Sequence, residues 1–352
     1  MSAPVSVTLF VTGFNQADTI GQAIAGAFAQ TCGALEILLC DDASSDGTAE
    51  IMAEAAARYA GPHAVRALPA RENGGIVANV NRAVAAARGE LIVMSGGDDE
   101  ALPPRCARLA EAWAAGGRSA ALLHSAARRM DAAGRDLAPP RDRAGWREGA
   151  RAIAPGPDGT PAPPLRILGA ERAVMGAAAA WPRALWDRFG PLPEAAGVED
   201  VLLTFRAALS GRPILYLDEA LLRWREGGVS SARAGPPDAR ETLYGLPLKL
   251  LRWRARAWAC ALDDLPASAL SPADRAAARA LIEDRLEAAR LRLALADAAR
   301  PGRLALLPRA AATALRRRRA EPLKLWARHL FDEAWIRRRD ARRRALPEAP
   351  AP

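Results

Sequence analysis

The chain has 352 residues, half of them hydrophobic, and a formal net charge of +9. This length allows one large domain or two smaller ones, and the apolar content is ample for a core. The positive charge favours polyanions, anionic lipids or phosphorylated ligands, but it predicts no fold. The four cysteines are scattered without a CxxC pair, which argues against a metal cluster or a disulfide framework and fits a reducing cytoplasm. We find neither a signal peptide nor a membrane span, which needs roughly 20 apolar residues.

The first hundred residues alternate between apolar runs and segments with helical spacing. Residues 5–15 are β-rich and end in Gly-Phe-Asn, and residues 17–30 have the spacing of a helix. A second apolar run ends at Asp41 and Asp42, and further helices are expected either side of a short strand near 64–68. This alternation predicts a mostly parallel, Rossmann-like sheet flanked by helices.

A third apolar run, Leu91–Met94, stops at a Ser-Gly-Gly break followed by Asp98 and Asp99. Neighbouring carboxylates resist joint ionisation, and a hard divalent cation would relieve their repulsion. The alternative is a turn acid and the cap of a helix that starts at the prolines 103 and 104. Ligands of open α/β sheets bind at the carboxyl ends of strands, where all these aspartates fall, so we favour a functional role.

The remaining elements follow in two groups. We expect a strand over 118–125, a long loop over 131–164, a short apolar run and a helix over 176–193, a helix over 197–211, and a strand pair over 213–226. After residue 232 the alternation ends, and helices are expected over 243–262, 271–299 and 321–344. We therefore predict two domains, 1–232 and an all-helical, basic extension over 233–352.

Four segments in order resemble the family 2 glycosyltransferases with the GT-A fold. They are VSVTLFVTGFNQADTIGQAIAGAFAQT, LEILLCDDASSDGTAEI, ENGGIVANVNRAVAAARGELIVMSGGDDE and GVED. The resemblance covers about Val5 to Ala232. It implies a nucleotide-sugar donor, UDP or dTDP favoured, Mn²⁺ or Mg²⁺, and an inverting transfer to a hydroxyl of a glycan or lipid-linked acceptor.

The resemblance also assigns roles to residues. Asp200 falls on the catalytic base, and Asp98 and Asp99 on the metal motif. Asp42 falls where a carboxylate accepts from the imide N–H of the base. The donor-binding positions are Thr12, Phe14, Asn15, Asp42, Asn73, Gly74, Asp98 and Arg225, the last of them near the diphosphate.

Three residues depart from the commoner family pattern. Gly96 stands where an acid is usual three residues before Asp99, which leaves fewer carboxylates for the metal. Gly13 replaces a Pro or Ser, and Gln16 replaces a Glu. Asp200 also has a plain interpretation, together with Glu199, as an acid favoured by the helix dipole in a first turn.

Two alternative functions remain open from the sequence. One is a catalytically inactive GT-A homologue that binds a partner, and the other is a basic nucleic-acid-binding protein. We expect no nucleic acid partner, because a polyanion would be repelled by the acids at the strand ends. The apolar stripe and arginines of 321–344 predict peripheral contact with an anionic membrane from the cytoplasmic side. The competing interpretation of that stripe is a homodimer interface.

Overall fold

The computed structural model describes residues 4–138, 163–169, 173–227, 248–297, 300–317, 322, 323 and 326. The chain forms two compact units. Unit 1 comprises Met1–Ala232 and Cys260–Leu281, and unit 2 comprises Arg233–Ala259 and Ile282–Pro352. The segment Cys260–Leu281 therefore belongs to the unit that carries the sheet, although it follows the other segment of that unit by 27 residues in the chain.

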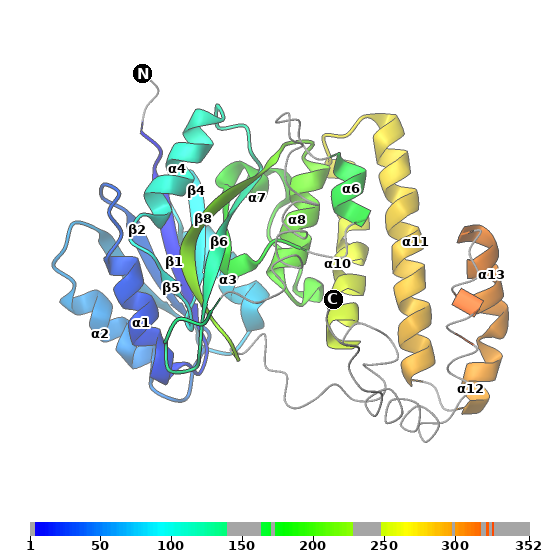
Figure 1. Cartoon of the computed structure of the whole chain (residues 1–352), viewed down its shortest axis with the longest axis horizontal. Helices are drawn as coiled ribbons and strands as arrows, with labels where there is room; N and C mark the ends of the chain where they lie inside the picture. Colours follow the sequence, from blue (N-terminus) through cyan, green and yellow to red (C-terminus); the bar gives the residue numbers. More distant parts are fainter. Residues whose placement is uncertain are drawn as a thin grey trace, which may run out of the picture. The chain divides into compact units, whose positions relative to one another are not determined.

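Unit 1 is built on an eight-stranded sheet in the order β3-β2-β1-β4-β7-β6-β8-β5 (Figure 1). The β1–β2, β2–β3, β1–β4 and β6–β8 pairs are parallel, whereas β7 is antiparallel to both β4 and β6. The mostly parallel sheet expected from the sequence is thus confirmed, with β7 as an antiparallel insertion and an antiparallel β5–β8 pair at the edge. The strands are β1 Val7–Gly13, β2 Glu36–Asp41, β3 Ala64–Pro69, β4 Leu91–Gly96, β5 Glu100–Ala101, β6 Leu122–Met130, β7 Ala179–Pro182 and β8 Ile214–Arg225.

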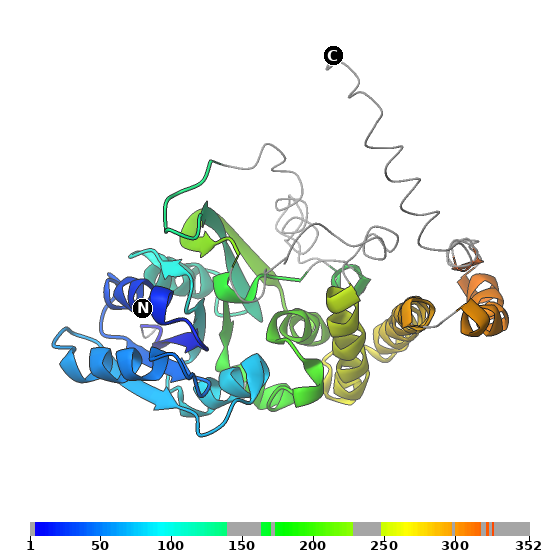
Figure 2. The ribbon, with the colours of Figure 1, turned by 90° about the horizontal axis from the view of Figure 1, so that it is seen from below.

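Helices cover both faces of this sheet (Figure 2). Crossovers between parallel strands are right-handed, so the steps from β1 to β2 to β3 place α1 and α2 on one face. The step from β3 to β4 reverses direction and places α3 on the other face. The first face is packed by α1, α2 and α4 through a cluster that includes Ile24, Met52 and Leu109. The helices are α1 Ala17–Phe28, α2 Thr48–Arg58, α3 Gly75–Ala86, α4 Arg105–Ala115, α6 Pro164–Gly169, α7 Arg183–Phe189 and α8 Glu199–Leu209.

The strand pair expected over 213–226 is wrong. Residues Ile214–Arg225 form one strand, β8, which pairs with β6 along its whole length. The register shifts between Ser125 and Ala127 absorb the extra residues of β8, as a bulge does. The polar residues Asp218 and Glu219 lie at this irregularity. Of the loop expected over 131–164, residues 139–162 lie outside the described part.

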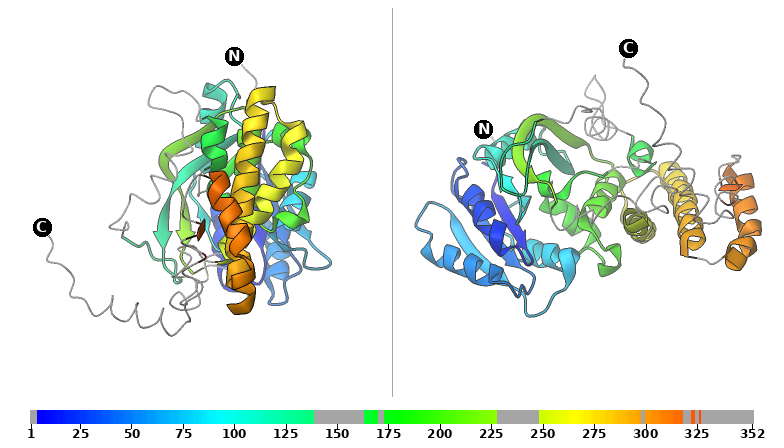
Figure 3. Two further views of the ribbon diagram at one scale, coloured as in Figure 1. Left: turned by 90° about the vertical axis from the view of Figure 1, so that its right-hand side faces the viewer. Right: turned by 60° about the horizontal axis from the view of Figure 1, so that its bottom comes forward.

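The C-terminal elements are helical where they are described, namely α10 Leu248–Asp264, α11 Pro272–Asp297, α12 Arg300–Ala305 and α13 Leu307–Arg317. Leu291 and Leu295 of α11 pack against Ala310 of α13 within unit 2 (Figure 3). The helix expected over 321–344 falls outside the described residues except for three positions. Within the described helices, none is long and apolar enough to cross a membrane.

One buried ion pair fastens the segment Cys260–Leu281 to the rest of unit 1. Arg206 of α8 is 1% exposed and donates through Nε to Asp264 Oδ2 at 2.8 Å. Its guanidinium also donates to the main-chain oxygens of Phe189, Gly190 and Pro191. A buried guanidinium is stable only when its hydrogen bonds are satisfied, and here every nitrogen has an acceptor. Arg206 therefore fixes α8 against the turn after α7 and the end of α10.

Replacing Arg206 with leucine leaves the buried Asp264 carboxylate without its partner, so we expect the free energy of unfolding to fall by about 3–5 kcal/mol. Urea denaturation followed by circular dichroism measures the change. The matched control is Arg108→Leu, because the Arg108–Glu219 pair is exposed and should contribute much less. Equal losses in the two variants would contradict this role for Arg206.

Candidate active site

The candidate site lies where the strand order reverses between β1 and β4. Successive connections run toward β3 on one side of this point and away from it on the other. Ligands of open α/β sheets bind outside the carboxyl ends of strands at such a switch point. β1 ends at Gly13, β2 at Asp41 and β4 at Gly96. The parallel register thus brings Thr12, Asp42 and the pair Asp98 and Asp99 to one edge of the sheet.

The turn after β1 is tied to the turn after β2. Asn15 has a positive φ of 50°, a conformation that asparagine tolerates better than most residues. Its main-chain N–H donates to Ser44 Oγ, and its Oδ1 accepts from the Ser45 N–H at 2.9 Å. Phe14 is exposed beside it, and Thr12 is buried with its hydroxyl toward the Ser95 carbonyl. The exposed ring of Phe14 is therefore free to stack on a planar ligand.

The two aspartates after β2 have different partners. Asp41 accepts from the N–H and hydroxyl of Ser44, as an aspartate that stabilises a turn commonly does. Asp42 is buried and accepts from the Gly74 N–H at 3.2 Å, with the Arg82 guanidinium 3.9 Å away. Asn73 accepts from the Gly75 N–H through its Oδ1. The structure thus joins Asp42 and the Asn73-Gly74 turn, which the sequence separates by 30 residues.

Asp98 and Asp99 lie in a turn between β4 and β5 that we call the aspartate turn, residues 96–99. The Asp99 N–H donates to the Gly96 carbonyl, and Thr19 donates to the Gly97 carbonyl at 3.1 Å. Asp99 is 3% exposed, and burial together with the charge of Asp98 raises the pKa of Asp99 to about 7. Two carboxylates forced together in this way form a site whose repulsion a divalent cation would relieve.

Gly96 gives these carboxylates their space. A Cβ at this position would lie 2.8 Å from Asp99 Oδ2 and 3.0 Å from Asp98 Oδ1. The two carboxylates therefore converge over the glycine, where an acid is usual in the family pattern. Among the described residues, no group of three or more His, Cys, Asp or Glu side chains is placed to hold a metal. The pair fits a hard cation that takes its remaining oxygen ligands from a phosphate group or water.

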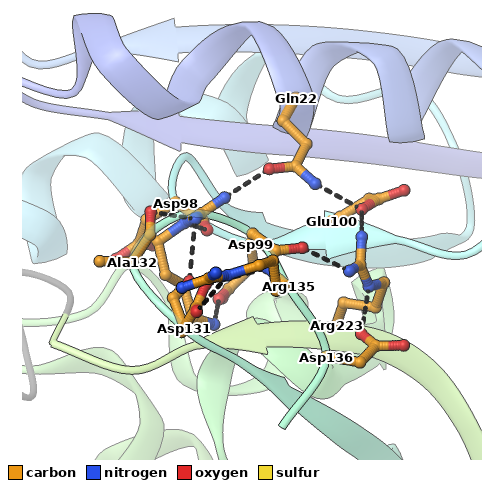
Figure 4. Close-up of polar contacts among 11 residues, drawn as sticks. Gln22, Asp98, Asp99, Glu100, Asp131, Ala132, Arg135, Asp136 and Arg223 are labelled. Carbon is orange, nitrogen blue, oxygen red and sulfur yellow. Dashed lines mark hydrogen bonds and ion pairs between the residues drawn. The ribbon is translucent and has the colours of Figure 1, made fainter.

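Arg225 lies beside the aspartate turn at the end of β8. Its main-chain N–H donates to Asp99 Oδ1 at 3.0 Å, and its Nε donates to the Asp98 carbonyl at 2.8 Å. Nη1 donates to the carbonyls of Asp131 and Ala132 (Figure 4). The family resemblance assigns Arg225 to the diphosphate of the donor. A contact between Arg225 and a diphosphate stays a prediction, and the main-chain carbonyls that already accept from its side chain compete with that contact.

The candidate base lies at the first turn of α8. Asp200 is half-buried, and its neighbour Glu199 is buried over Gly176 of the short helix η1, Gly176–Ala178. A Cβ at Gly176 would overlap the Glu199 carboxyl group. Burial and the charge of Asp200 raise the pKa of Glu199 to about 8, so Glu199 is mainly neutral at pH 7. Asp200 is therefore the more exposed acid of this pair.

Two functional relationships escaped the sequence reasoning. Arg105, the first residue of α4, is completely buried and donates to the carbonyls of Met94 in β4 and Ala177 in η1, both at 2.6 Å. It thereby links the strand that carries the aspartate turn to the segment that packs on Glu199. Asp46 accepts from the Ala17 N–H and from Thr48, so it stabilises the starts of both α1 and α2. In the sequence, Arg105 looks like one more arginine in an arginine-rich chain.

Comparisons with known proteins agree with this geometry. Residues 8–154 match the family model described as glycosyl transferase family 2. The putative glycosyltransferase EpsE of Bacillus subtilis is 30% identical over 105 residues, which is 30% of this chain and 37% of EpsE. The curated relatives are matched over only 25% to 37% of their own length.

Solved structures extend the likeness to most of the chain. S. aureus TarS 1-349 in complex with UDP-GlcNAc aligns with a TM-score of 0.57 and 16% identity, over 92% of this chain and 90% of TarS. The mannosyltransferase PcManGT from Pyrobaculum calidifontis, in complex with GDP-Man and Mn²⁺, aligns with a TM-score of 0.52 and 19% identity. This alignment covers 99% of this chain and 89% of PcManGT. At these identities the likeness establishes the fold, which is that of the GT-A glycosyltransferases. The match to the family 2 model covers the N-terminal segment, residues 8–154, which is less than half of the chain.

Proposed function

We propose that the chain is an inverting glycosyltransferase that moves a sugar from a nucleoside diphosphate to an acceptor hydroxyl. One observation carries the proposal: the carboxyl edge of β1, β2 and β4 gathers the carboxylate of Asp42 and the carboxylate pair of Asp98 and Asp99. TarS and PcManGT, which share the fold, are complexed with UDP-GlcNAc and GDP-Man. Thermal-shift screening against UDP, dTDP and GDP, each with and without Mn²⁺, tests it first.

The residues would divide the work as follows. Phe14 stacks on the base, Thr12 and Asn15 border the nucleoside, and Asp42 accepts from the imide N–H of uracil or thymine. Asn73 and Gly74 border the base beside Asp42, since the Gly74 N–H donates to the Asp42 carboxylate. Asp98 and Asp99 would hold Mn²⁺ or Mg²⁺, which neutralises the charge that grows on a diphosphate leaving group.

Asp200 would take the proton of the acceptor hydroxyl. A hydroxyl is a poor nucleophile until a carboxylate removes its proton as the new bond forms. The oxygen then attacks the anomeric carbon from the face opposite the diphosphate, the glycosidic bond forms as the bond to the diphosphate breaks, and the configuration inverts. The neutral Glu199 beside Asp200 leaves the charge on one carboxylate of the pair.

We further propose a glycan or lipid-linked acceptor and a peripheral location on an anionic membrane. Unit 2 supplies the support, because Leu304 and Leu315 are 54% and 79% exposed on its helices. Exposed leucines on a helix suit either a membrane surface or a second copy of the chain. Sedimentation with anionic vesicles at low and high salt separates these cases: salt-sensitive binding supports the membrane, whereas a stable dimer without binding supports the copy.

The first site prediction concerns the base of the nucleotide. Asp42→Asn keeps an oxygen for the Gly74 N–H but removes the charge that accepts from the imide N–H. A hydrogen bond to a charged group contributes about 1.5–3 kcal/mol, so UDP should bind roughly 10- to 100-fold more weakly. CDP, which has no imide N–H, should change less. Asp41→Asn is the matched control for calorimetry, because the Asp41 carboxylate accepts from Ser44 of its own turn. Equal effects on UDP and CDP would refute the pairing.

The second prediction concerns the metal. Asp99→Asn should abolish the gain in UDP affinity that Mn²⁺ provides, and Asp98→Asn should reduce it, because two carboxylates supply all the protein charge at the turn. Calorimetric UDP titrations with Mn²⁺ and with a chelator measure the gain without requiring the natural acceptor. Asp46→Asn, which removes an acid from the nearby turn before α2, should leave the gain unchanged. An undiminished gain in Asp99→Asn would place the metal elsewhere.

The third prediction concerns the catalytic base, Asp200. Asp200→Asn should bind UDP normally but lower the transfer rate by about 10²–10⁴-fold, since a carboxamide cannot accept the proton. Glu199→Gln is the control, because glutamine resembles the neutral form that Glu199 adopts at pH 7. It should keep most of the activity. If Glu199→Gln loses transfer and Asp200→Asn retains it, the roles of the two acids are exchanged.

The control variant Glu199→Gln should also change how the free energy of unfolding depends on pH. Because the folded-state pKa of Glu199 is raised from 4.5 to about 8, the folded protein binds more protons than the unfolded chain between these values. The contribution of Glu199 to stability is therefore complete below pH 4.5 and is lost as the pH rises through 8. Relative to wild type, Glu199→Gln should become progressively more stable over this window. Urea denaturation at pH 5, 6.5 and 8 measures the difference, and a constant difference would mean that Glu199 is ionised.

A further inference from the structure

Arg225 has more contacts around the aspartate turn than any role at a diphosphate requires. Its side chain is buried, and it comes from the last residue of β8. Nε donates to the Asp98 carbonyl at 2.8 Å, and Nη1 donates to the carbonyls of Asp131 at 3.1 Å and Ala132 at 2.7 Å. Nη2 donates to Gln22 Oε1 of α1. The single N–H of Nε and the pair on Nη1 are thus matched by protein oxygens.

These contacts converge on three separate parts of unit 1. The aspartate turn accepts from Arg225 twice, once from the side chain and once from the main-chain N–H to Asp99 Oδ1. The turn 131–136, which follows β6, accepts through its carbonyls. α1 accepts through Gln22, whose amide nitrogen donates in turn to Glu100 Oε2 at 2.7 Å (Figure 4). Arg225 is therefore the common donor to the segments that border the two carboxylates.

Arg223 offers a built-in comparison two residues earlier on the same strand. Its Nη1 donates to Glu100 Oε2 at 2.5 Å, its Nε to Asp136 Oδ1 at 2.8 Å, and its Nη2 to the Gly134 carbonyl at 2.6 Å. Arg223 thus fastens the turn 131–136 to the same neighbourhood, through Glu100. The side-chain donors of Arg223 reach Glu100, Asp136 and Gly134, whereas Nε of Arg225 reaches the Asp98 carbonyl.

We propose that Arg225 is a positioning residue that fixes the aspartate turn for metal binding, and not a ligand of the diphosphate. The inference rests on the proposed function of that turn. Asp98 and Asp99 repel each other, so a turn held only by its own hydrogen bonds would relax and separate them. The guanidinium opposes this by fixing the Asp98 carbonyl, and the β8 main chain fixes one oxygen of Asp99. A carboxylate pair held at a fixed separation binds a cation without first reorganising.

Positioning of the aspartate turn and binding of the diphosphate predict different losses of affinity when Arg225 is replaced. Groups that orient metal ligands typically cost 10–100-fold in metal affinity when they are removed. Arg225→Gln should therefore weaken Mn²⁺ binding to UDP-saturated protein by about 10- to 100-fold. A phosphate ligand would instead lower UDP affinity in the absence of metal while leaving uridine affinity unchanged. Arg223→Gln, which removes the same charge from the same strand, should leave Mn²⁺ affinity unchanged.

The experiment titrates Mn²⁺, UDP and uridine calorimetrically into wild type, Arg225→Gln and Arg223→Gln. Hydrogen–deuterium exchange of the metal-free proteins gives a readout without activity: peptides covering 96–101 should exchange faster in Arg225→Gln than in Arg223→Gln. Arg225→Lys keeps a charged group with several N–H donors, so it should recover part of the Mn²⁺ affinity. This variant replaces Arg225→Gln in the experiment if Arg225→Gln does not fold.

The outcomes distinguish a failure of the positioning role of Arg225 from a failure of the proposed glycosyltransferase function. Wild type that binds neither UDP nor Mn²⁺ would remove the proposed function itself. Wild type that binds both, with Mn²⁺ affinity unchanged in Arg225→Gln and Arg225→Lys, would overturn the positioning role alone. A metal-independent loss of UDP affinity, with uridine affinity preserved, would return Arg225 to the diphosphate.

Discussion

Two carboxylates that repel each other lie at the end of a buried strand, and much of unit 1 is arranged to hold them there. Asp98 and Asp99 turn over Gly96 because a side chain at that position would occupy their space. Thr19 fixes the Gly97 carbonyl, and Arg225 fixes the Asp98 carbonyl and one Asp99 oxygen. Burial in a medium of low polarity makes the repulsion costly, which is why the pKa of Asp99 rises to about 7. A cation between the carboxylates would reverse that cost.

Sheet topology decides which other groups share this edge. Because the strand order reverses between β1 and β4, the ends of β1, β2 and β4 lie side by side while the crossover helices leave to opposite faces. The turns after these strands then bond to one another, as Asn15 does to Ser45 and Gly74 does to Asp42. A site built from such turns is held by the sheet below and by hydrogen bonds between the loops above. Its binding groups can therefore vary without altering the core.

Buried arginines connect this edge to the rest of unit 1. Arg105 reaches the carbonyls of β4 and η1, Arg225 reaches three main-chain carbonyls and Gln22, and Arg206 reaches Asp264 and the turn after α7. A guanidinium suits this work because its donors form a rigid fork that remains charged when buried. Among the described residues, Arg58, Arg88 and Arg135 are exposed. The positive composition had suggested an external polyanion. The buried arginines instead serve internal carbonyls and carboxylates.

The sequence by itself determined the class of fold, the order of the first strands and helices, and the positions of the aspartates at strand ends. These follow from local periodicity and from the rule that parallel strands bring their carboxyl ends to one edge. It gave no sign that Asp42 meets Gly74, because that contact depends on the distant turn at residues 73–75. It also predicted a strand pair where β8 is one strand, because the bulge that lets β8 pair continuously with β6 depends on a strand far away in the sequence. Only the tertiary structure decided that Glu199 is buried and mainly neutral, that Arg105 joins β4 to η1, and that Arg225 bonds to the aspartate turn. Each of these depends on burial and on contacts between residues far apart in the chain, and no local pattern encodes them.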